Sequence, residues 1–139
     1  MVNEEDIQQK YMQFQTLQQQ MQQINEHVEL LNQQNADLDI SKNALEELGK
    51  TAVDNEILAP IANGIFFKAT LKDNQKLVLN VGSNTTVEKT IPEAVNLLTK
   101  QQQEIIERIA EAEKILQEMN AQAMKIYEDV EQSVQQAQG

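Results

Sequence analysis

Side chains that could carry out chemistry are few in this chain. Its 139 residues include one histidine, His27, and no cysteine, which excludes a thiolate zinc site and a disulfide framework. The sequence has no Gly-x-x-x-x-Gly-Lys-Ser/Thr loop to hold nucleotide phosphates. Asp73-Asn74 is more typical of a turn than of a calcium site. We therefore expect no catalytic residue, no metal and no cofactor, and we do not expect an enzyme.

The chain is strongly acidic, with 22 acidic and 11 basic residues and a formal net charge of −11. This balance argues against binding to nucleic-acid phosphates or to anionic membranes, which attract clustered Lys and Arg. The acidic runs near both ends are expected to be solvated faces or to dock on a basic protein surface. No apolar run approaches the ~20 residues that cross a bilayer, and residues 1–6 do not resemble a signal peptide. The expected location is cytoplasmic.

Residues 1–49 are expected to form one long helix of a coiled coil. Between Asn3 and Leu48 there is neither Gly nor Pro, and Gly49 supplies a stop. About 45 helical residues would span on the order of 68 Å. Apolar residues recur at heptad positions a and d, which is typical of a coiled-coil seam. The a and d positions hold Ile7, Lys10, Phe14, Leu17, Met21, Ile24, Val28, Leu31, Asn35, Leu38, Lys42 and Leu45.

Residues 92–139 repeat the pattern after a helix start at Pro92 and Glu93. Their a and d positions hold Val95, Leu98, Gln102, Ile105, Ile109, Ala112, Leu116, Met119, Ala123, Ile126, Val130, Ser133 and Ala137. We expect the two helices to pack on each other as an antiparallel pair. In the register we favour, the numbers of two facing residues add up to 140, although totals of 133 or 147 would match a with d equally well.

Three seam positions, Asn35, Lys42 and Gln102, fall in successive layers of this register and are polar. One interpretation is that they specify the register, as polar a positions often do. The other interpretation is that they form a flexible joint between the helices and the middle of the chain.

The middle of the chain changes from a heptad period to a period of two. We expect four strands, at residues 57–61, 64–72, 76–82 and 85–90, arranged as two hairpins. Pro60 indicates an edge or a bulge. The apolar stripe expected to face an assembly sheet comprises Ile65, Phe67, Leu71, Leu77, Leu79, Val81 and Val87. About 41 residues without a disulfide or a metal are too few to stand alone, so this segment is expected to join strands from other chains.

The predicted fold class is therefore α+β and mostly α. A long antiparallel coiled-coil hairpin carries two central β-hairpins that join a β-barrel between subunits. The whole chain, 1–139, is expected to be a single domain, with an N-terminal helix at 1–49, hairpins for assembly at 50–91 and a C-terminal helix at 92–139.

Three short motifs in the middle segment resemble a known family. They are Leu58-Ala59-Pro60, Val81-Gly82 at the end of a strand, and Val87-Glu88-Lys89 before the second helix. Together with the helix, two hairpins, helix plan, they resemble the alpha-class subunit of prefoldin, a co-chaperone of archaea and eukaryotes. The sequence departs from the family at Asn84 and Thr85-Thr86, where many members carry Gly and an aromatic or aliphatic pair.

The resemblance implies a hexamer of two alpha and four beta subunits joined through a double β-barrel. It also implies that six coiled coils hold non-native proteins at their tips without ATP and pass them to a group II chaperonin. The partners implied are thus prefoldin beta-class subunits, a group II chaperonin and non-native client proteins. Two alternatives remain open: a coiled-coil scaffold that spaces specific partners without chaperone activity, and a helical hairpin that docks RNA or an enzyme.

Client-binding residues are expected at the tip, where both chain ends lie. The apolar candidates there are Ile7, Tyr11, Met12, Phe14, Ile126, Tyr127, Val130 and Val134. Clients expose apolar side chains, which a frayed seam would match. Ile7, Phe14, Ile126 and Val130 are equally well explained as seam residues. Tyr11 and Met12 lie off the seam, which favours a binding role for them.

Overall fold

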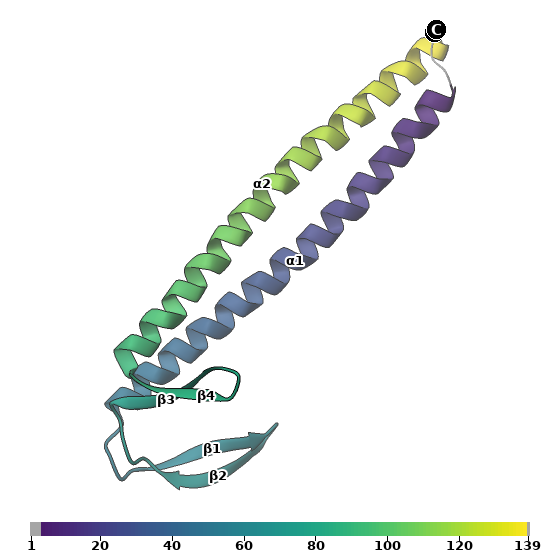
Figure 1. Cartoon of the computed structure of the whole chain (residues 1–139). Coiled ribbons are helices and arrows are strands. Elements are labelled where there is room, and N and C mark those ends of the chain that lie inside the picture. The colour runs from purple at the N-terminus through teal and green to yellow at the C-terminus, as the bar shows by residue number, and fades with distance from the viewer. Residues whose placement is uncertain (1–3, 139) are drawn as a thin grey trace. The chain divides into compact units, whose positions relative to one another are not determined.

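A computed structural model describes residues 4–138 and contains two long helices and two β-hairpins (Figure 1). In chain order the elements are α1 (Glu4–Lys50), β1 (Glu56–Ala62), β2 (Ile65–Thr70), β3 (Lys76–Gly82), β4 (Thr85–Thr90) and α2 (Ile91–Gln138). This order confirms the predicted fold class for the single chain. The description does not include residues 1–3 and 139, which belong to the predicted helical segments. It also leaves out the side chain of Ala137.

Two compact units make up the chain. One unit, here called the helical unit, consists of the residues up to Gln34 together with those from Glu104 onward. The other, here called the hairpin unit, is Asn35–Gln103 and contains all four strands.

The helical unit is an antiparallel helix pair (Figure 1). All predicted a and d positions in its described part are buried or half-buried, with Leu31 and Ala123 each 3% exposed. Lys10 Nζ lies 3.9 Å from Asp129 Oδ2, and the Phe14 and Tyr127 ring centroids are 6.4 Å apart. These contacts agree with the register whose facing numbers add up to 140, and not with 133 or 147.

In the hairpin unit, the side chains of Lys42 and Gln102 bind each other, and Asn35 contributes only its backbone carbonyl, since its Oδ1 is buried without a hydrogen-bond partner among the described residues. Gln102 is 8% exposed, and its Nε2 donates to Asp39 Oδ1 at 2.7 Å and to the Asn35 carbonyl at 3.3 Å. Lys42 Nζ donates to Gln102 Oε1 at 3.1 Å. Because a buried amide without partners is costly and these bonds require one alignment of the helices, the network supports the register interpretation.

The hairpins form two separate two-stranded sheets, β1–β2 and β3–β4. In the first, Ala59 pairs with Phe67, and the register shifts between Pro60 and Ala62, which agrees with the bulge, one of the two alternatives expected at Pro60. In the second, Leu79 pairs with Val87. Its turn places Gly82, Ser83 and Asn84 at positive φ, and Asn tolerates this region better than most residues. The hairpin thus forms with Asn84 in place of the family's Gly.

The second strand is shorter than predicted, since β2 ends at Thr70 and not at residue 72. Beyond it, the Leu71 N–H donates to the Asn55 carbonyl at 2.9 Å, and the Leu71 carbonyl accepts from the Asp54 N–H at 2.8 Å. Leu71 is 7% exposed. Its backbone therefore pairs with the segment that precedes β1 and not with β1 itself. Placing Leu71 on a strand of the assembly sheet was wrong.

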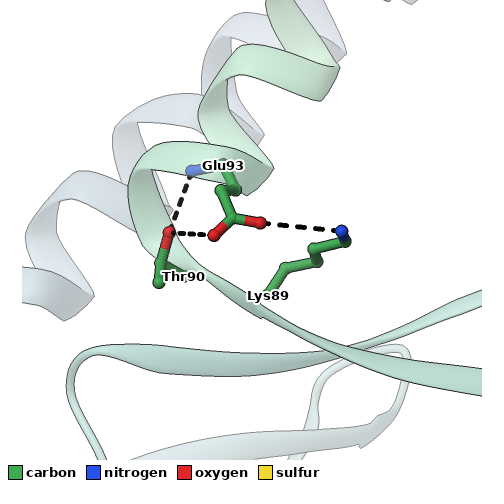
Figure 2. Close-up of polar contacts among 3 residues, drawn as sticks. All are labelled: Lys89, Thr90 and Glu93. Carbon is green, nitrogen blue, oxygen red and sulfur yellow. Dashed lines mark hydrogen bonds and ion pairs between the residues drawn. The ribbon is translucent and has the colours of Figure 1, made fainter.

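The second helix begins with a reciprocal side-chain cap (Figure 2). The Glu93 N–H donates to Thr90 Oγ1 at 3.3 Å, and that hydroxyl donates to Glu93 Oε1 at 3.2 Å. Lys89 Nζ lies 3.6 Å from Glu93 Oε2. The Ile91 N–H donates to the Gln75 carbonyl at 3.0 Å. These bonds satisfy N–H groups that a helix start leaves free, and they attach α2 to the connection before β3.

Candidate functional site

Two grooves flank the seam at the tip of the helical unit, the end where α1 begins and α2 ends. The first groove, here called the acidic groove, has a volume of about 430 Å³. It is lined by Phe14, Gln18, Met21, Asn120, Ala123, Met124, Tyr127, Glu128 and Glu131. The second, here called the neutral groove, has a volume of about 400 Å³. It is lined by Met12, Gln13, Thr16, Leu17, Gln122 and Ile126.

The acidic groove is built around one aromatic contact. The rings of Phe14 and Tyr127 are tilted by 42°, a favourable geometry for an aromatic pair. Phe14 is half-buried in the seam, whereas Tyr127 and Met124 are 59% and 58% exposed. Ala123 is buried between the helices and leaves room beside it. The groove thus has a fixed apolar floor and a wall of accessible, adaptable apolar side chains.

The neutral groove has a different wall. Met12 is 65% exposed, and its carbonyl accepts a hydrogen bond from Thr16 Oγ1 at 3.0 Å. Leu17 and Ile126, both half-buried seam residues, supply its apolar floor. None of its lining residues is charged, so it can recognise a ligand only by apolar contact and by hydrogen bonds from uncharged groups.

The predicted client-binding residues divide into two sets. Tyr11, Met12, Tyr127 and Val134 lie on the flanks of the helices and are exposed. Ile7, Phe14, Ile126 and Val130 are half-buried in the seam. Phe14 and Ile126 nevertheless line one groove each. Phe14 and Ile126 can therefore be both seam residues and client-binding residues, because they pack in the seam and also form groove floors.

Met124 and Met21 are groove residues that the sequence reasoning did not propose. Met21 was assigned to the seam, and Met124 lies off it, so neither stood out. The available signal was spacing: Met124 precedes Tyr127 by three residues, and residues i and i+3 share a helix face. The helix across the seam completes the groove, and no local pattern shows that.

Negative charge dominates the acidic groove. Lys10 and Asp129 form an ion pair at the tip, but both are about two-fifths exposed, so the pair is weak. Glu128 and Glu131 are exposed, and neither is ion-paired with another residue of the described range 4–138. The groove therefore offers two free carboxylates beside an apolar surface.

The hairpin unit presents a second apolar surface. Its large exposed apolar residues on strands are Leu58, Ile61, Ile65, Phe66, Phe67, Val78 and Val81. Of the predicted assembly residues, Ile65, Phe67 and Val81 are exposed, Leu77, Leu79 and Val87 are half-buried, and Leu71 is buried in the connection. Phe66 and Phe67 are neighbours and point to opposite faces. The first hairpin is thus apolar on both faces, which the sequence reasoning did not anticipate.

Among residues 4–138 no group of three or more acidic or His side chains is placed to hold a metal ion. None of the described helices is long and apolar enough to cross a membrane.

Comparison with known proteins assigns the family. The family model described as "Prefoldin subunit" matches residues 17–136. The chain belongs to the prefoldin family. Prefoldin subunit alpha of Pyrococcus horikoshii is 32% identical over 137 residues, which cover 98% of this chain and 92% of that protein. Prefoldin subunit alpha of Thermofilum pendens is 30% identical over 99 residues, 71% of this chain and 74% of that protein.

A solved structure shows the same fold. The filamentous prefoldin from Methanocaldococcus jannaschii, determined by cryo-electron microscopy, matches with a TM-score of 0.78 at 17% identity and covers 86% of this chain and 98% of that chain. The family model and the alpha-subunit relatives confirm the resemblance to alpha-class prefoldin that the hairpin motifs indicated. Prefoldins are chaperone subunits, and the chain is a member of that family.

Proposed function

We propose that this chain is the alpha-class subunit of an ATP-independent holdase, which binds non-native proteins at its coiled-coil tip and delivers them to a group II chaperonin. The observation that carries the proposal is the pair of grooves at the tip, where Met12, Met124 and Tyr127 are more than half exposed beside half-buried seam residues. Single exposed apolar side chains are common, but a group of them gathered around a groove is typical of a surface that binds other proteins.

The chemistry of the grooves suits clients of many sequences. Methionine side chains are flexible and polarisable, so they adapt to differently shaped apolar groups. Each groove is small and open, which makes binding at one tip weak. Several tips acting on one client would raise the total affinity through effective concentration and would still allow release. Holding of this kind requires no nucleotide.

The hairpin unit supports the assembly part of the proposal. Two-stranded sheets are marginally stable alone, and those of this chain leave Leu58, Phe66 and Val78 at least 57% exposed. We propose that strands of prefoldin beta-class subunits cover these faces in a β-barrel between subunits, in a hexamer of two alpha and four beta chains. The proposed location of this assembly is cytoplasmic.

The first experiment is to tag the chain, purify it gently from its own cells, and determine the mass and composition of the complex. Two copies with four smaller coiled-coil subunits, accompanied by chaperonin and mixed unfolded proteins, would support the proposal. One fixed partner without chaperonin would indicate the scaffold alternative.

A second experiment tests the tip. The double variant Tyr11→Ala/Met12→Ala, in an intact assembly, should suppress aggregation of a denatured client less than the wild type does. The matched control is Leu30→Ala/Ile40→Ala, which removes two apolar side chains of α1 that are 52% and 67% exposed but line neither tip groove. Equal activity of both variants and the wild type would contradict the tip assignment.

A further inference from the structure

We infer that the acidic groove selects client segments in which an apolar side chain stands next to a lysine or arginine. The inference rests on the proposed holdase function and assigns a substrate class to one of its two grooves. The apolar side chain would occupy the space between Phe14, Met124 and Tyr127, and the cationic group would lie against Glu128 and Glu131.

The difference between the two grooves is the basis of the inference. They have similar volumes, about 430 and 400 Å³, and each has a floor of seam residues. Only the acidic groove has charged lining residues, and both are carboxylates on one helix, three residues apart, on neighbouring turns. Such a pair attracts a cation and repels an acidic segment, whereas the neutral groove has no means of making this distinction.

The size of the acidic groove limits its occupant. Its volume lies near the lower end of the range for small-molecule sites, so it accommodates a few side chains and not a folded surface. An aromatic or aliphatic residue fits the aromatic wall, and the guanidinium plane of an arginine can also stack on the exposed Tyr127 ring. A non-native polypeptide supplies both groups on neighbouring residues.

The adjoining surface extends the site along the helices. A further depression of about 410 Å³ is lined by Met21, Asn25, Leu116, Gln117 and Asn120. It shares Met21 and Asn120 with the acidic groove. The uncharged amides of Gln18, Asn25 and Asn120 can donate to and accept from the backbone of an extended client. The track therefore matches a segment of unfolded chain and not a single side chain.

The test uses the full chain in its purified assembly and three fluorescent decapeptides that share one apolar core. Two core-flanking residues are Lys in the first peptide, Gln in the second and Glu in the third. We expect the Lys peptide to bind about fivefold more tightly than the Gln peptide at low salt, because two exposed carboxylates contribute modestly to a charge pair. The Glu peptide should bind most weakly, and the preference should shrink at high salt.

The variant Glu128→Gln/Glu131→Gln should reduce the ratio of Lys-peptide to Gln-peptide affinity to near one. Its matched control is Glu111→Gln/Glu118→Gln, which removes the same charge from exposed positions of α2 outside the groove and should keep the preference. Tyr127→Ala should weaken binding of all three peptides.

The outcomes separate the inference from the proposed function. A Lys preference that is absent in the wild type, or that survives Glu128→Gln/Glu131→Gln, overturns the inference, and the holdase proposal stands if Tyr127→Ala still weakens the Gln peptide. If no peptide binds, or Tyr127→Ala changes nothing, client binding at this groove fails and the inference fails with it. If Glu128→Gln/Glu131→Gln abolishes binding to purified chaperonin and leaves the peptide preference intact, the carboxylates serve chaperonin docking and the inference is wrong.

Discussion

The helical unit and the hairpin unit differ in where their apolar side chains go. In the helical unit the seam residues meet within the chain, so that Leu31, Ala112 and Ala123 are no more than 8% exposed. In the hairpin unit Leu58, Phe66 and Val78 remain 57–69% exposed. A two-helix coiled coil buries its one apolar stripe on a partner stripe, whereas a lone hairpin has two faces and nothing to cover either. The first unit thus buries its apolar stripe within one chain, whereas the second leaves apolar faces open, as the proposed assembly requires.

The largest effect should come from a charge on the hairpin surface. Phe67→Glu is expected to abolish assembly with beta-class subunits, because burying an unpaired carboxylate in an interface costs several kcal/mol. Size-exclusion chromatography with light scattering should show loss of the oligomer, and circular dichroism should show retained helix. Lys68→Glu, at the neighbouring residue that already carries a charge, should assemble. If the oligomer still forms with Phe67→Glu, the exposed apolar face of the first hairpin is not the surface that other subunits cover.

A change inside the helical unit should be the next largest. Leu31→Ala removes a side chain that is 3% exposed and should destabilise the coiled coil by about 2–4 kcal/mol. Chemical denaturation followed by circular dichroism would measure this. Leu30→Ala, at the adjacent residue with 52% exposure, should change stability by no more than about 0.5 kcal/mol. Similar losses for the two variants would show that the seam is not the source of stability.

The polar seam network predicts a smaller effect. Gln102→Ala leaves Asp39 Oδ1 and Lys42 Nζ without their partner and should cost about 1–2 kcal/mol. Gln102→Leu should recover most of that loss, because an apolar seam residue packs well, but it should relax the register. Disulfide trapping with cysteines at the facing seam positions 45 and 95, in chains that carry either Gln102 or Leu at position 102, would report the register. Trapping as specific as with Gln102 present would rule out the register role.

The smallest effect should lie in the turn before β3. Asp73 Oδ1 accepts hydrogen bonds from the N–H groups of Gln75 and Lys76 at 2.8 and 3.1 Å, and these bonds lower the pKa of Asp73 below its usual value. The turn should therefore be stabilised above the unfolded pKa, about 3.9, and should lose that stabilisation as the pH falls through the lower folded value.

Carbon-13 NMR titration of the Asp73 carboxyl would give this folded pKa directly. Asp73→Ala should weaken the turn at neutral pH and should make progressively less difference as the pH falls through the folded pKa of Asp73. A normal pKa for Asp73 would show that these hydrogen bonds do not persist in solution.

Much of the fold could be predicted because its signals are local or strictly periodic. The heptad from Ile7 to Leu45 predicted which residues of α1 are half-buried or buried, and Pro60 indicated an edge or a bulge where the register of the first hairpin shifts. The end of β2 was missed, because alternation continues through Leu71 in the sequence while its N–H group bonds to Asn55 instead. That choice depends on a segment sixteen residues earlier in the chain, and no pattern within the strand records it.

By itself, the sequence determined the two coiled-coil helices, the residues of their seam, the two hairpins and the family motifs. Each of these follows from the spacing of residues along one stretch of chain, which governs burial through the 3.5- and 2-residue periods. Only the tertiary structure decided which flank residues act together. Phe14 and Tyr127 meet, and Met124 joins them in a groove beside Glu128, because the antiparallel pairing brings together residues from opposite ends of the chain.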